Sequence, residues 1–443
     1  MKANQTRIVL CGGARTPIGH FARSLSGLRA EELMVLALEA ALVKTNLTKE
    51  NVDGLIVGCV GQSFSAPNIA RVAALKAGLP EKSQAVTVQN NCVSSIESVA
   101  AAARMIVAGE GELFVAGGTE CMSRLPYTID GSRAAKLLRS MAVVRERWGE
   151  LLAAGDVSVV DSIEQGLTDP IRRINMAGAA EVSAQTYGIG RREQDDYARE
   201  SFRRSIAGWK SGFYGTHVVP AAGLDKDEYP FLREDLPEKP RLMAKAAPFY
   251  DNPAYSIKDF YRDFGLYING AAAPEGASGT VTLFNSCGRS DGAAAVIVAS
   301  ERRAKELGLE VMAELKGWGF TGADPAHMGT APALAAPIAL QRADISFEDL
   351  DLIELHEPFA ATVLSIFKLG EQKFGHDWAG KDAAGKLNPH GGSIALGHPL
   401  GATGARLLLN LLHGLRREPG ARMGMIAACA QGGVGGAMVV ERI

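Results

Sequence analysis

The sequence predicts an α/β fold in which two similar halves stack as layers of helix and sheet, with an inserted segment between them. Short apolar runs alternate with helix-like stretches over residues 1–122 and again from residue 278 onward. Residues 123–277 are richer in charge, tyrosine and proline and lack this alternation. The chain of 443 residues is too long for one ordinary core. We therefore expect a first half at 1–122 plus 278–308, an inserted loop domain at 123–277 and a second half at 309–443.

In the first half, expected strands and helices alternate from the beginning. We expect a strand at 8–11, an amphipathic helix at 31–43, a strand at 54–59 and a helix at about 68–77. The stretch 88–118, VQNNCVSSIESVAAAARMIVAGEGELFVAGG, then predicts a strand, a turn carrying Cys92, a helix and a second strand. Small residues in that helix would let another backbone pack closely against it. The helix is therefore expected in the middle of the layers.

Cys92 stands at or just before the start of this helix, which Ser94 or Ser95 would cap. Unpaired backbone N–H groups and the helix dipole favour an anion at such a position. They would lower the pKa of the thiol toward a reactive thiolate. The alternative is a small buried hydrophobic residue, which many free cysteines are. This stretch alone leaves both interpretations open.

The inserted segment begins with an expected helix at 132–153, which carries cations at Arg133, Lys136, Arg139, Arg145 and Arg147. One interpretation is a helix docked on its own core with a solvated face. The other is a site for an anionic cofactor or a membrane surface. A second charged helix is expected at 190–209, and 229–274 is expected to be an irregular lid or insertion.

Alternation resumes at 278–300, where we expect two strands around a turn. The second half then repeats the first. Residues 47–57 (LTKENVDGLIV) align with 345–355 (ISFEDLDLIEL) at an offset of 298, and the same offset carries Asn90-Asn91-Cys92 onto Asn388-Pro389-His390. The agreement of both segments indicates an internal duplication. The central helices of the two halves would then be buried between the sheets.

Three blocks of the second half carry reactive side chains. LIELHEPFA (352–360) ends a strand with His356, NPHGGSIALGHPLGATGAR (388–406) holds His390 and His398, and MIAACAQGGVGGAMVVE (425–441) places Cys429 between two strands. Each block alone has a purely structural explanation. Together they put imidazoles and a second thiol at corresponding strand ends, which lie near one another in a doubled α/β fold.

Composition excludes several classes of function. Forty-seven basic and 49 acidic side chains give a net charge of −2, which argues against nucleic-acid binding. The six cysteines show neither a CxxC pair nor zinc-ligand spacing, so we expect no disulfide, no structural zinc and a reducing, cytoplasmic location. We also expect no secretory signal and no transmembrane segment, because apolar runs of about 18 residues are absent.

The chain resembles a thiolase almost from end to end. The likeness rests on long, ordered and mutually spaced blocks: NNCVSSIES, AGGTECMSRLPY (116–127), NMAGAAEVSAQTYGIGRREQDDYA (175–198), HEPFA, GHPLGATGAR and CAQGG. It implies the thiolase fold, with duplicated halves in an α/β/α/β/α arrangement and an inserted loop domain.

The resemblance also implies roles for individual residues. Cys92 would accept the acyl group, His398 would remove its proton, and Cys429 would be the acid and base for carbon. His356, with a water, would hold one thioester oxygen. Backbone N–H groups at Cys92 and Gln431, supported by Gly432, would hold the other. Met176 and Ser286 are the candidates for contacts with coenzyme A, which would be a substrate. No metal or permanently bound cofactor is implied.

Departures from the family pattern shape the choice of activity. Most thiolases carry Asn where this chain has His356, and the His form with CAQGG resembles β subunits of fatty-acid oxidation trifunctional complexes. That favours a degradative 3-ketoacyl-CoA thiolase over acetoacetyl-CoA synthesis. Asn175, where some short-chain enzymes have His, and the long connection 250–277 leave chain length and CoA contacts open.

Assembly and the alternatives follow from the same likeness. We expect a homodimer or homotetramer paired near strand 114–118, read here as an edge with few charges. A hydratase/dehydrogenase partner subunit and a peripheral membrane contact stay open.

One alternative activity is that of an acetoacetyl-CoA-forming acetyl-CoA acetyltransferase. Another is that of a decarboxylating ketosynthase-type enzyme, and Cys429 argues against this second one. A non-catalytic subunit that binds acyl-CoA represents a different class of protein.

Overall fold

The structure is a computed structural model that describes residues 6–63, 65–130, 149–150, 152–153, 158–270 and 272–443. Most of the expected cationic helix at 132–153, including all five of its named cations, lies outside the described residues. Within the described ranges, no helix is both long enough and apolar enough to cross a membrane.

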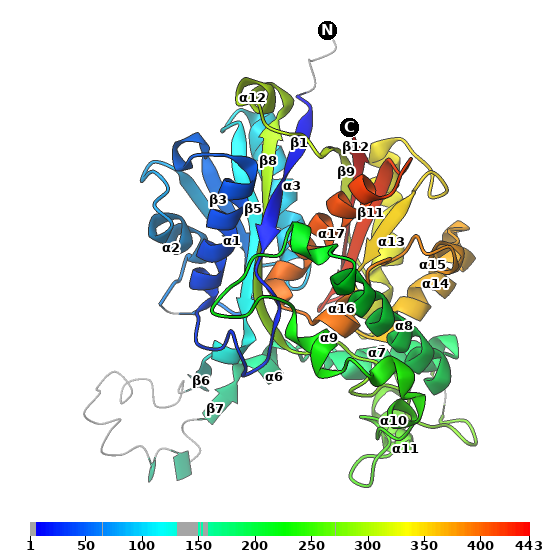
Figure 1. The fold of residues 1–443 in the computed structure, drawn as a ribbon. Helices are drawn as coiled ribbons and strands as arrows, with labels where there is room; N and C mark the ends of the chain where they lie inside the picture. Colours follow the sequence, from blue (N-terminus) through cyan, green and yellow to red (C-terminus); the bar gives the residue numbers. More distant parts are fainter. Residues whose placement is uncertain (1–5, 64, 131–148, 151, 154–157, 271) are drawn as a thin grey trace.

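One mixed sheet runs through both halves of the chain (Figure 1). Its strands follow the order β10-β11-β12-β9-β1-β8-β5-β3-β4, and the short β2 pairs with β8. The strands are β1 (Ile8–Arg15), β2 (Gly19–His20), β3 (Gly54–Gly58), β4 (Gln84–Val88), β5 (Leu113–Cys121), β8 (Ser290–Ser300), β9 (Ala313–Gly322), β10 (Leu352–Leu355), β11 (Met423–Ala430) and β12 (Val434–Arg442).

The order of the strands repeats outward from the centre, where β1 meets β9. On one side β8, β5 and β3 follow β1, and on the other β12, β11 and β10 follow β9. The directions match as well, because β8 and β12 are antiparallel to the central strands, while β3 and β10 run parallel to β5 and β11. The helices after β1 and β9 end at left-handed residues 298 positions apart, Asn46 and Asp344. The predicted duplication is confirmed.

Helices form three layers around the two halves of the sheet (Figure 1). The outer layers are α1 (Ala30–Thr45) with α2 (Ile69–Lys76), and α13 (Ala331–Ala343) with α14 (Ala360–Phe374). The central layer is α3 (Ser94–Ala108) against α17 (Thr403–Arg417), in a core that draws on strands from both halves. These helices approach closely, since a Cβ at Gly404 would lie 2.8 Å from the backbone N of Ile96. The predicted five-layer α/β/α/β/α arrangement is therefore present.

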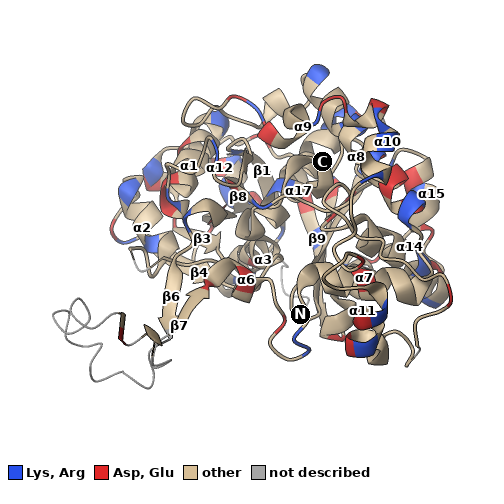
Figure 2. Cartoon of the chain, turned by 90° about the horizontal axis from the view of Figure 1, so that it is seen from below, with Lys and Arg blue, Asp and Glu red and all other residues tan. Residues whose placement is uncertain are grey.

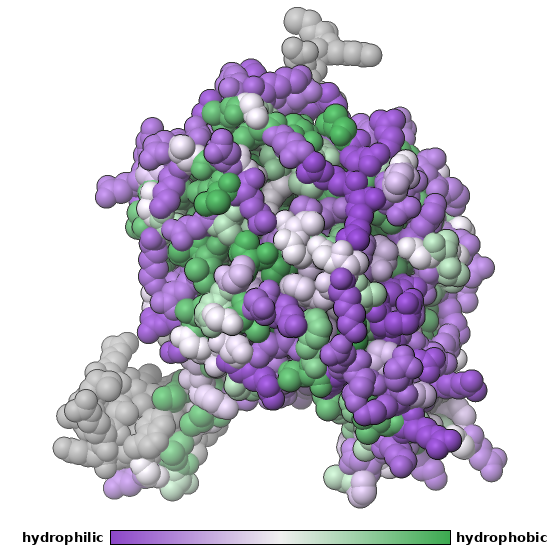
Figure 3. Space-filling view, in the orientation of Figure 1, coloured by the Kyte–Doolittle hydropathy of each residue, from purple (hydrophilic) through white to green (hydrophobic). Residues whose placement is uncertain are grey.

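Residues between the halves form a small sheet and a set of helices, most of which lie beside the second half (Figure 1). The sheet pairs β6 (Tyr127–Asp130) with β7 (Ser158–Asp161). It forms an arm that carries hydrophobic residues, coloured green in Figure 3. The helices are α6 (Ser162–Gly166), α7 (Met176–Tyr187), α8 (Arg191–Lys210), α9 (Glu228–Leu232), α10 (Pro240–Ala244) and α11 (Ile257–Phe264). The region expected to be irregular, 229–274, therefore contains short helices.

The remaining helical segments are short connections. They are η1 (Lys49–Asn51), η2 (Met122–Arg124), η4 (Tyr214–Thr216), η5 (Leu236–Glu238), η6 (Gly265–Tyr267), α12 (Glu301–Glu306), η7 (Pro325–Thr330), α15 (Trp378–Ala383), α16 (Ser393–Leu396) and η8 (Leu400–Ala402). Charged side chains lie mainly on the outer helices, among them α1, α2, α8 and α10 (Figure 2).

Three local predictions are wrong. The expected pair of strands at 278–300 is the single strand β8, because the Glu181 carboxylate accepts the backbone N–H groups of Thr280 and Val281 that a second strand would have used. Strand β5, expected at an edge, lies between β3 and β8, and β4 ends the sheet instead. The N-cap of α3 is Val93, without a side-chain hydrogen bond.

Candidate active site

Cys92 lies in the turn between β4 and α3, as predicted. Asn91 holds this turn in a left-handed conformation with φ of 47°, and its amide donates to the Gln431 carbonyl at 3.0 Å. The Ser94 hydroxyl, which was predicted as a cap, donates instead to the Asn91 carbonyl at 2.6 Å. The turn at Cys92 is therefore fixed from the second half of the chain and from its own helix.

The thiol of Cys92 is neutral at rest, which corrects the prediction of a lowered pKa. Burial raises the pKa of Cys92 to about 12, and the nearby charge of Glu120 acts in the same direction. The backbone N–H groups of Gln431 and of Cys92 itself act to lower this pKa, but burial outweighs them. Position at a helix start is therefore insufficient to ionise this thiol. A base has to remove its proton before the sulfur can act as a nucleophile.

His398 supplies an imidazole in the loop between α16 and η8. Its Nδ1 lies 2.7 Å from the Thr403 hydroxyl, and its backbone N–H donates to the Gly288 carbonyl at 3.0 Å. Burial, with the charge of Arg406 as the smaller cause, lowers the pKa of His398 to about 3. The ring is therefore neutral near pH 7 and has a free nitrogen to take a proton.

His356 follows directly after β10, and its ring centroid lies 4.2 Å from that of His398. Its Nδ1 is 2.8 Å from the Ser393 hydroxyl, and its backbone N–H donates to the Ala427 carbonyl at 2.8 Å. Burial, then the neighbouring His398, lowers the pKa of His356 well below the ordinary value. Among the described residues, Nε2 of neither ring has a hydrogen-bond partner.

The next residue, Glu357, anchors the end of β10 to the inserted segment. Its buried carboxylate accepts hydrogen bonds from the Tyr197 hydroxyl at 3.0 Å and from the Ser201 hydroxyl at 2.6 Å, both on α8. The Asn388 amide donates to it as well, at 2.6 Å. Three donors on two distant segments therefore fix the backbone that carries His356.

Cys429 is the next-to-last residue of β11, so it lies within a strand and not between two strands. Burial, then the nearby Cys92, raises the pKa of Cys429 well above its ordinary value. The turn that follows holds Gln431 and Gly432, the latter with φ of +82°. Gly433 completes the turn, where a Cβ would lie 2.1 Å from the Ala323 carbonyl oxygen, so the site excludes any larger residue.

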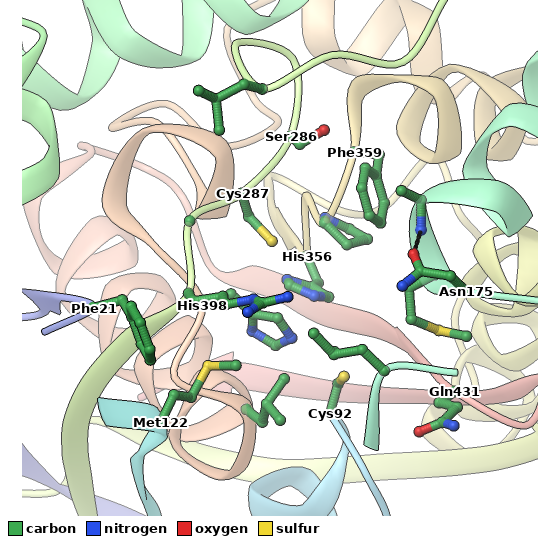
Figure 4. A pocket seen from close by; sticks show the side chains of 18 of the residues that line it. Phe21, Cys92, Met122, Asn175, Ser286, Cys287, His356, Phe359, His398 and Gln431 are labelled. Carbon is green, nitrogen blue, oxygen red and sulfur yellow. Dashed lines mark hydrogen bonds between the residues drawn. The ribbon is translucent and has the colours of Figure 1, made fainter. Parts of the chain in front are cut away.

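A cavity of about 720 Å³ collects the predicted site residues (Figure 4). Its lining includes seven of them: Cys92, Met176, Ser286, His356, His398, Cys429 and Gln431. The rest of the wall is largely apolar, with Phe21, Met122, Leu167, Phe249, Tyr250, Leu283, Met328, Phe359 and Leu400. The cavity thus joins two thiols and two imidazoles to a largely apolar space.

Two residues singled out in the sequence lie outside this lining. His390 stacks on Phe213 with ring centroids 3.5 Å apart, so its structural explanation is correct. Gly432 belongs to the turn beside the cavity, without lining it.

Sequence reasoning missed several side chains that line the cavity. Cys287 is a third thiol there, and its only signal was adjacency to Ser286. Arg233 brings a cation to the wall, stacked at 4.4 Å on the ring of Tyr229, and no motif marked it. Within the described ranges, no group of three or more His, Cys, Asp or Glu side chains is arranged to hold a metal ion.

Comparison with known proteins gives consistent matches. The sequence profile of the thiolase N-terminal domain matches residues 8–254, and that of the thiolase C-terminal domain matches 309–442. An acetyl-CoA acetyltransferase of Cupriavidus necator is 36% identical over 440 residues, which is 99% of this chain and 100% of the relative. One from Chromobacterium violaceum is 36% identical over 98% of this chain and 99% of its own.

Solved structures agree over the same length. The human mitochondrial 3-ketoacyl-CoA thiolase in complex with CoA superimposes with a TM-score of 0.82 at 31% identity, covering 99% of this chain and 98% of its own. The acetyl-CoA acetyltransferase of Bacillus anthracis gives a TM-score of 0.81 at 31% identity, covering 99% of both chains. Profiles, sequences and structures thus match both halves and the segment between them, and the chain belongs to the thiolase family.

Proposed function

We propose that this chain is a CoA-dependent acyltransferase that cleaves 3-ketoacyl-CoA to acetyl-CoA and a shortened acyl-CoA. The observation that carries the proposal is the cavity in which Cys92, Cys429, His356 and His398 meet. Relatives that are named acetyl-CoA acetyltransferases, and a thiolase structure that contains CoA, support acyl-CoA as the class of substrate.

The first half-reaction begins with a proton transfer. Because the Cys92 thiol and the His398 imidazole are both neutral at rest, His398 Nε2 takes the proton as the sulfur attacks the 3-keto carbon. The bond between C2 and C3 then breaks, leaving an acyl thioester on Cys92. The carbanion of acetyl-CoA takes a proton from the Cys429 thiol and departs.

The second half-reaction restores the enzyme. The Cys429 thiolate takes the proton of an incoming CoA thiol, and the CoA sulfur attacks the thioester on Cys92. Acyl-CoA leaves, and the Cys92 thiolate recovers its proton from His398. The steps balance with side chains and CoA alone, so the proposal assigns the chain no permanently bound cofactor.

Two donor groups stabilise the oxygens that become negative in these steps. His356 Nε2 has no protein partner among the described residues and would donate to one thioester oxygen. The backbone N–H groups of Cys92 and Gln431 would donate to the other, with Gly432 shaping the turn. Preorganised donors of this kind act most strongly in a site that excludes water.

The same residues can run in reverse as an acetoacetyl-CoA-forming acetyl-CoA acetyltransferase, and the names of the relatives favour this second candidate. The size and apolar lining of the 720 Å³ cavity favour longer chains, whose thiolysis is the degradative reaction of fatty-acid β-oxidation. Met176 and Ser286, which line the cavity, remain the proposed CoA contacts.

We further propose the predicted division into two halves, with 123–277 as the loop domain, and a homodimer or homotetramer in a reducing compartment such as the cytoplasm. All six cysteines are free, which suits that compartment. The outer side of β4 is the pairing surface we now favour, since β4 ends the sheet and its Val86 is exposed. A monomer in sedimentation at micromolar concentration would contradict the assembly.

The experiment that tests the activity follows the enolate absorbance of 3-ketoacyl-CoA substrates. Addition of CoA should remove the absorbance of acetoacetyl-CoA and of longer substrates, with a higher kcat/KM for the longer ones. A preference for acetoacetyl-CoA would favour the acetyltransferase candidate. If CoA causes no loss of absorbance with any chain length, the protein is left as one that binds acyl-CoA without catalysis. That result would contradict the proposal.

A further inference from the structure

Both imidazoles line the cavity, and among the described residues the Nε2 atom of each has no hydrogen-bond partner. The proposed chemistry nevertheless needs opposite properties from these two atoms. His398 has to accept a proton at Nε2, whereas His356 has to donate a hydrogen bond from Nε2. A neutral imidazole carries its proton on only one nitrogen, so the hydrogen bond at Nδ1 decides which property Nε2 has.

For His398, the contacts of Thr403 decide which ring nitrogen carries the proton. The Thr403 hydroxyl oxygen lies 2.7 Å from His398 Nδ1 and 3.0 Å from the Pro399 carbonyl oxygen. Each of these short contacts requires a hydrogen between its two heavy atoms. The carbonyl has no hydrogen, so the hydroxyl hydrogen goes to Pro399. The second hydrogen therefore comes from His398 Nδ1, which leaves Nε2 proton-free.

On His356 the contacts of Ser393 give the opposite result. The Ser393 hydroxyl accepts a hydrogen bond from Arg406 Nη2 at 2.7 Å and lies 2.8 Å from His356 Nδ1. Ser393 is fully buried, and its hydroxyl has no other partner among the described residues. The arrangement that leaves no buried hydroxyl hydrogen unmatched has Ser393 donating to Nδ1, which places the proton of His356 on Nε2.

Arg406 strengthens this arrangement through its charge. It is 1% exposed and comes from α17, which lies between the two halves of the sheet. A guanidinium only donates hydrogen bonds, so Arg406 occupies one lone pair of the Ser393 hydroxyl oxygen. Its charge also disfavours a second proton on either imidazole, in keeping with the lowered pKa values of His356 and His398.

We propose that Thr403 on one side, and Ser393 with Arg406 on the other, are positioning residues that hold His398 and His356 in opposite tautomers. His398 then presents a proton acceptor to Cys92, and His356 presents a hydrogen-bond donor to the thioester oxygen. The geometry is independent of the proposed function, whereas the roles of base and donor rest on it.

Neutron diffraction from a deuterium-exchanged crystal of the full chain reads the tautomers directly. We expect deuterium on Nδ1 of His398 and on Nε2 of His356. Deuterium on the same nitrogen of both rings, or the reverse assignment, would overturn the inference even if the enzyme proves to be an active thiolase. The expected pattern in a protein without thiolase activity would instead contradict the proposed function alone.

Kinetics test the role of Thr403 with a matched pair of variants. Thr403→Val keeps the shape of the side chain and removes the acceptor, so His398 can move its proton to Nε2. A wrong tautomer of a catalytic imidazole costs up to about 10⁴-fold in kcat. We expect acylation of Cys92 to fall steeply with KM little changed, and Thr403→Ser to restore most of the rate. A Thr403→Val enzyme as fast as Thr403→Ser would overturn the assignment.

Ser393→Ala tests the other ring separately. It removes the donor to His356 Nδ1 and should lower kcat by up to the roughly 10²–10³-fold that one oxyanion donor is worth. Alkylation of Cys92 by iodoacetamide, which needs only His398, should keep the wild-type rate. Equal loss of alkylation and turnover in Ser393→Ala would contradict the separate roles of the two imidazoles.

Discussion

Glu120 of β5 accepts the backbone N–H of Gly401 at 3.0 Å, so a carboxylate from the first half holds the loop that carries His398. The same carboxylate accepts the backbone N–H groups of Val60 and Gly61 at 3.1 and 2.9 Å. The two backbones nearly touch here, since a Cβ at Gly118 would lie 1.9 Å from the Gly401 carbonyl oxygen. The position of the proposed base relative to Cys92 therefore depends on this contact between the halves.

Glu120→Gln should lower both the free energy of unfolding and kcat. The amide can accept through only one atom, so at least one buried N–H group loses its partner, at a cost of about 1–3 kcal/mol. Urea denaturation should show this loss, and kcat should fall because the loop of His398 is less well held. Glu418→Gln, at an exposed position in the second half, is the control for the loss of a carboxylate charge. An unchanged free energy of unfolding in Glu120→Gln would contradict the argument.

Cys92 should be the residue that becomes acylated. Mass spectrometry after brief exposure to 3-ketoacyl-CoA should find the adduct on Cys92, which, with Cys287, is one of the two partly exposed cysteines. Iodoacetamide should likewise modify Cys92 well before the four buried thiols. Cys92→Ala should abolish turnover with an unchanged circular dichroism spectrum. An acyl adduct on Cys429 with none on Cys92 would reverse the assignment of the two thiols.

Cys429→Ala should separate the two parts of the reaction. Carbon–carbon cleavage and solvent deuterium exchange at the methyl group of acetyl-CoA both need a proton carrier at carbon, so both should be lost. Transfer of an acyl group from acyl-CoA to Cys92 should survive in part, because that step mainly needs His398. The two rates can be measured on the same preparation. If they fall equally, the division of labour between the thiols is wrong.

His356→Ala removes a donor to the thioester oxygen and should lower kcat by about 10²–10³-fold. His356→Asn keeps an N–H donor of shorter reach, so its loss should be smaller. Both variants should retain the rate of Cys92 alkylation, since His398 is untouched. Steady-state kinetics on one 3-ketoacyl-CoA substrate is sufficient to rank the three enzymes. An alanine variant as active as the asparagine variant would remove His356 from the oxyanion site.

The pH dependence should reflect a neutral thiol beside a neutral imidazole. Burial lowers the pKa of His398 to about 3, so its basic form persists through the range near pH 6.5 where an ordinary histidine becomes protonated. The acid limb of kcat/KM should therefore lie below about pH 5. Alkylation of Cys92 should keep rising with pH beyond about 8.5, the ordinary pKa of cysteine, toward its own value near 12. A rate of alkylation that shows no further rise above about pH 8.5 would indicate that the thiolate is already formed and would contradict this interpretation.

The sequence was sufficient for the elements whose causes are local. The alternation that predicted β3 and the apolar run before His356 that predicted β10 each depend on residues within one segment, and both strands are present. The reactive residues Cys92, His356 and His398 could be found because each lies in a long, specific block. The structure then brings these blocks to one cavity.

Most of the wrong predictions share a different origin, because they depended on distant contacts. Residues 279–282 form no strand because Glu181, about a hundred positions earlier, accepts their backbone N–H groups. Strand β5 lies inside the sheet because β8, more than 150 residues later, pairs with it. The pKa of Cys92 was misjudged because burial by both halves outweighs the helix start. The roles of Ser393 and Thr403 also required atomic contacts, although both stood in the glycine-rich block.

The raised pKa of Cys92 has a consequence for damage by oxidants. Peroxides react with thiolates, and a thiol with a pKa of about 12 is ionised to only about one part in 10⁵ near pH 7. A peroxide that attacks without help from a base therefore reacts slowly, whereas a bound acyl-CoA or an alkylating agent in the cavity would react with a sulfur that His398 deprotonates in the act of attack. The enzyme at rest should survive oxidative stress that inactivates enzymes with a permanent thiolate, and it should become sensitive only during turnover.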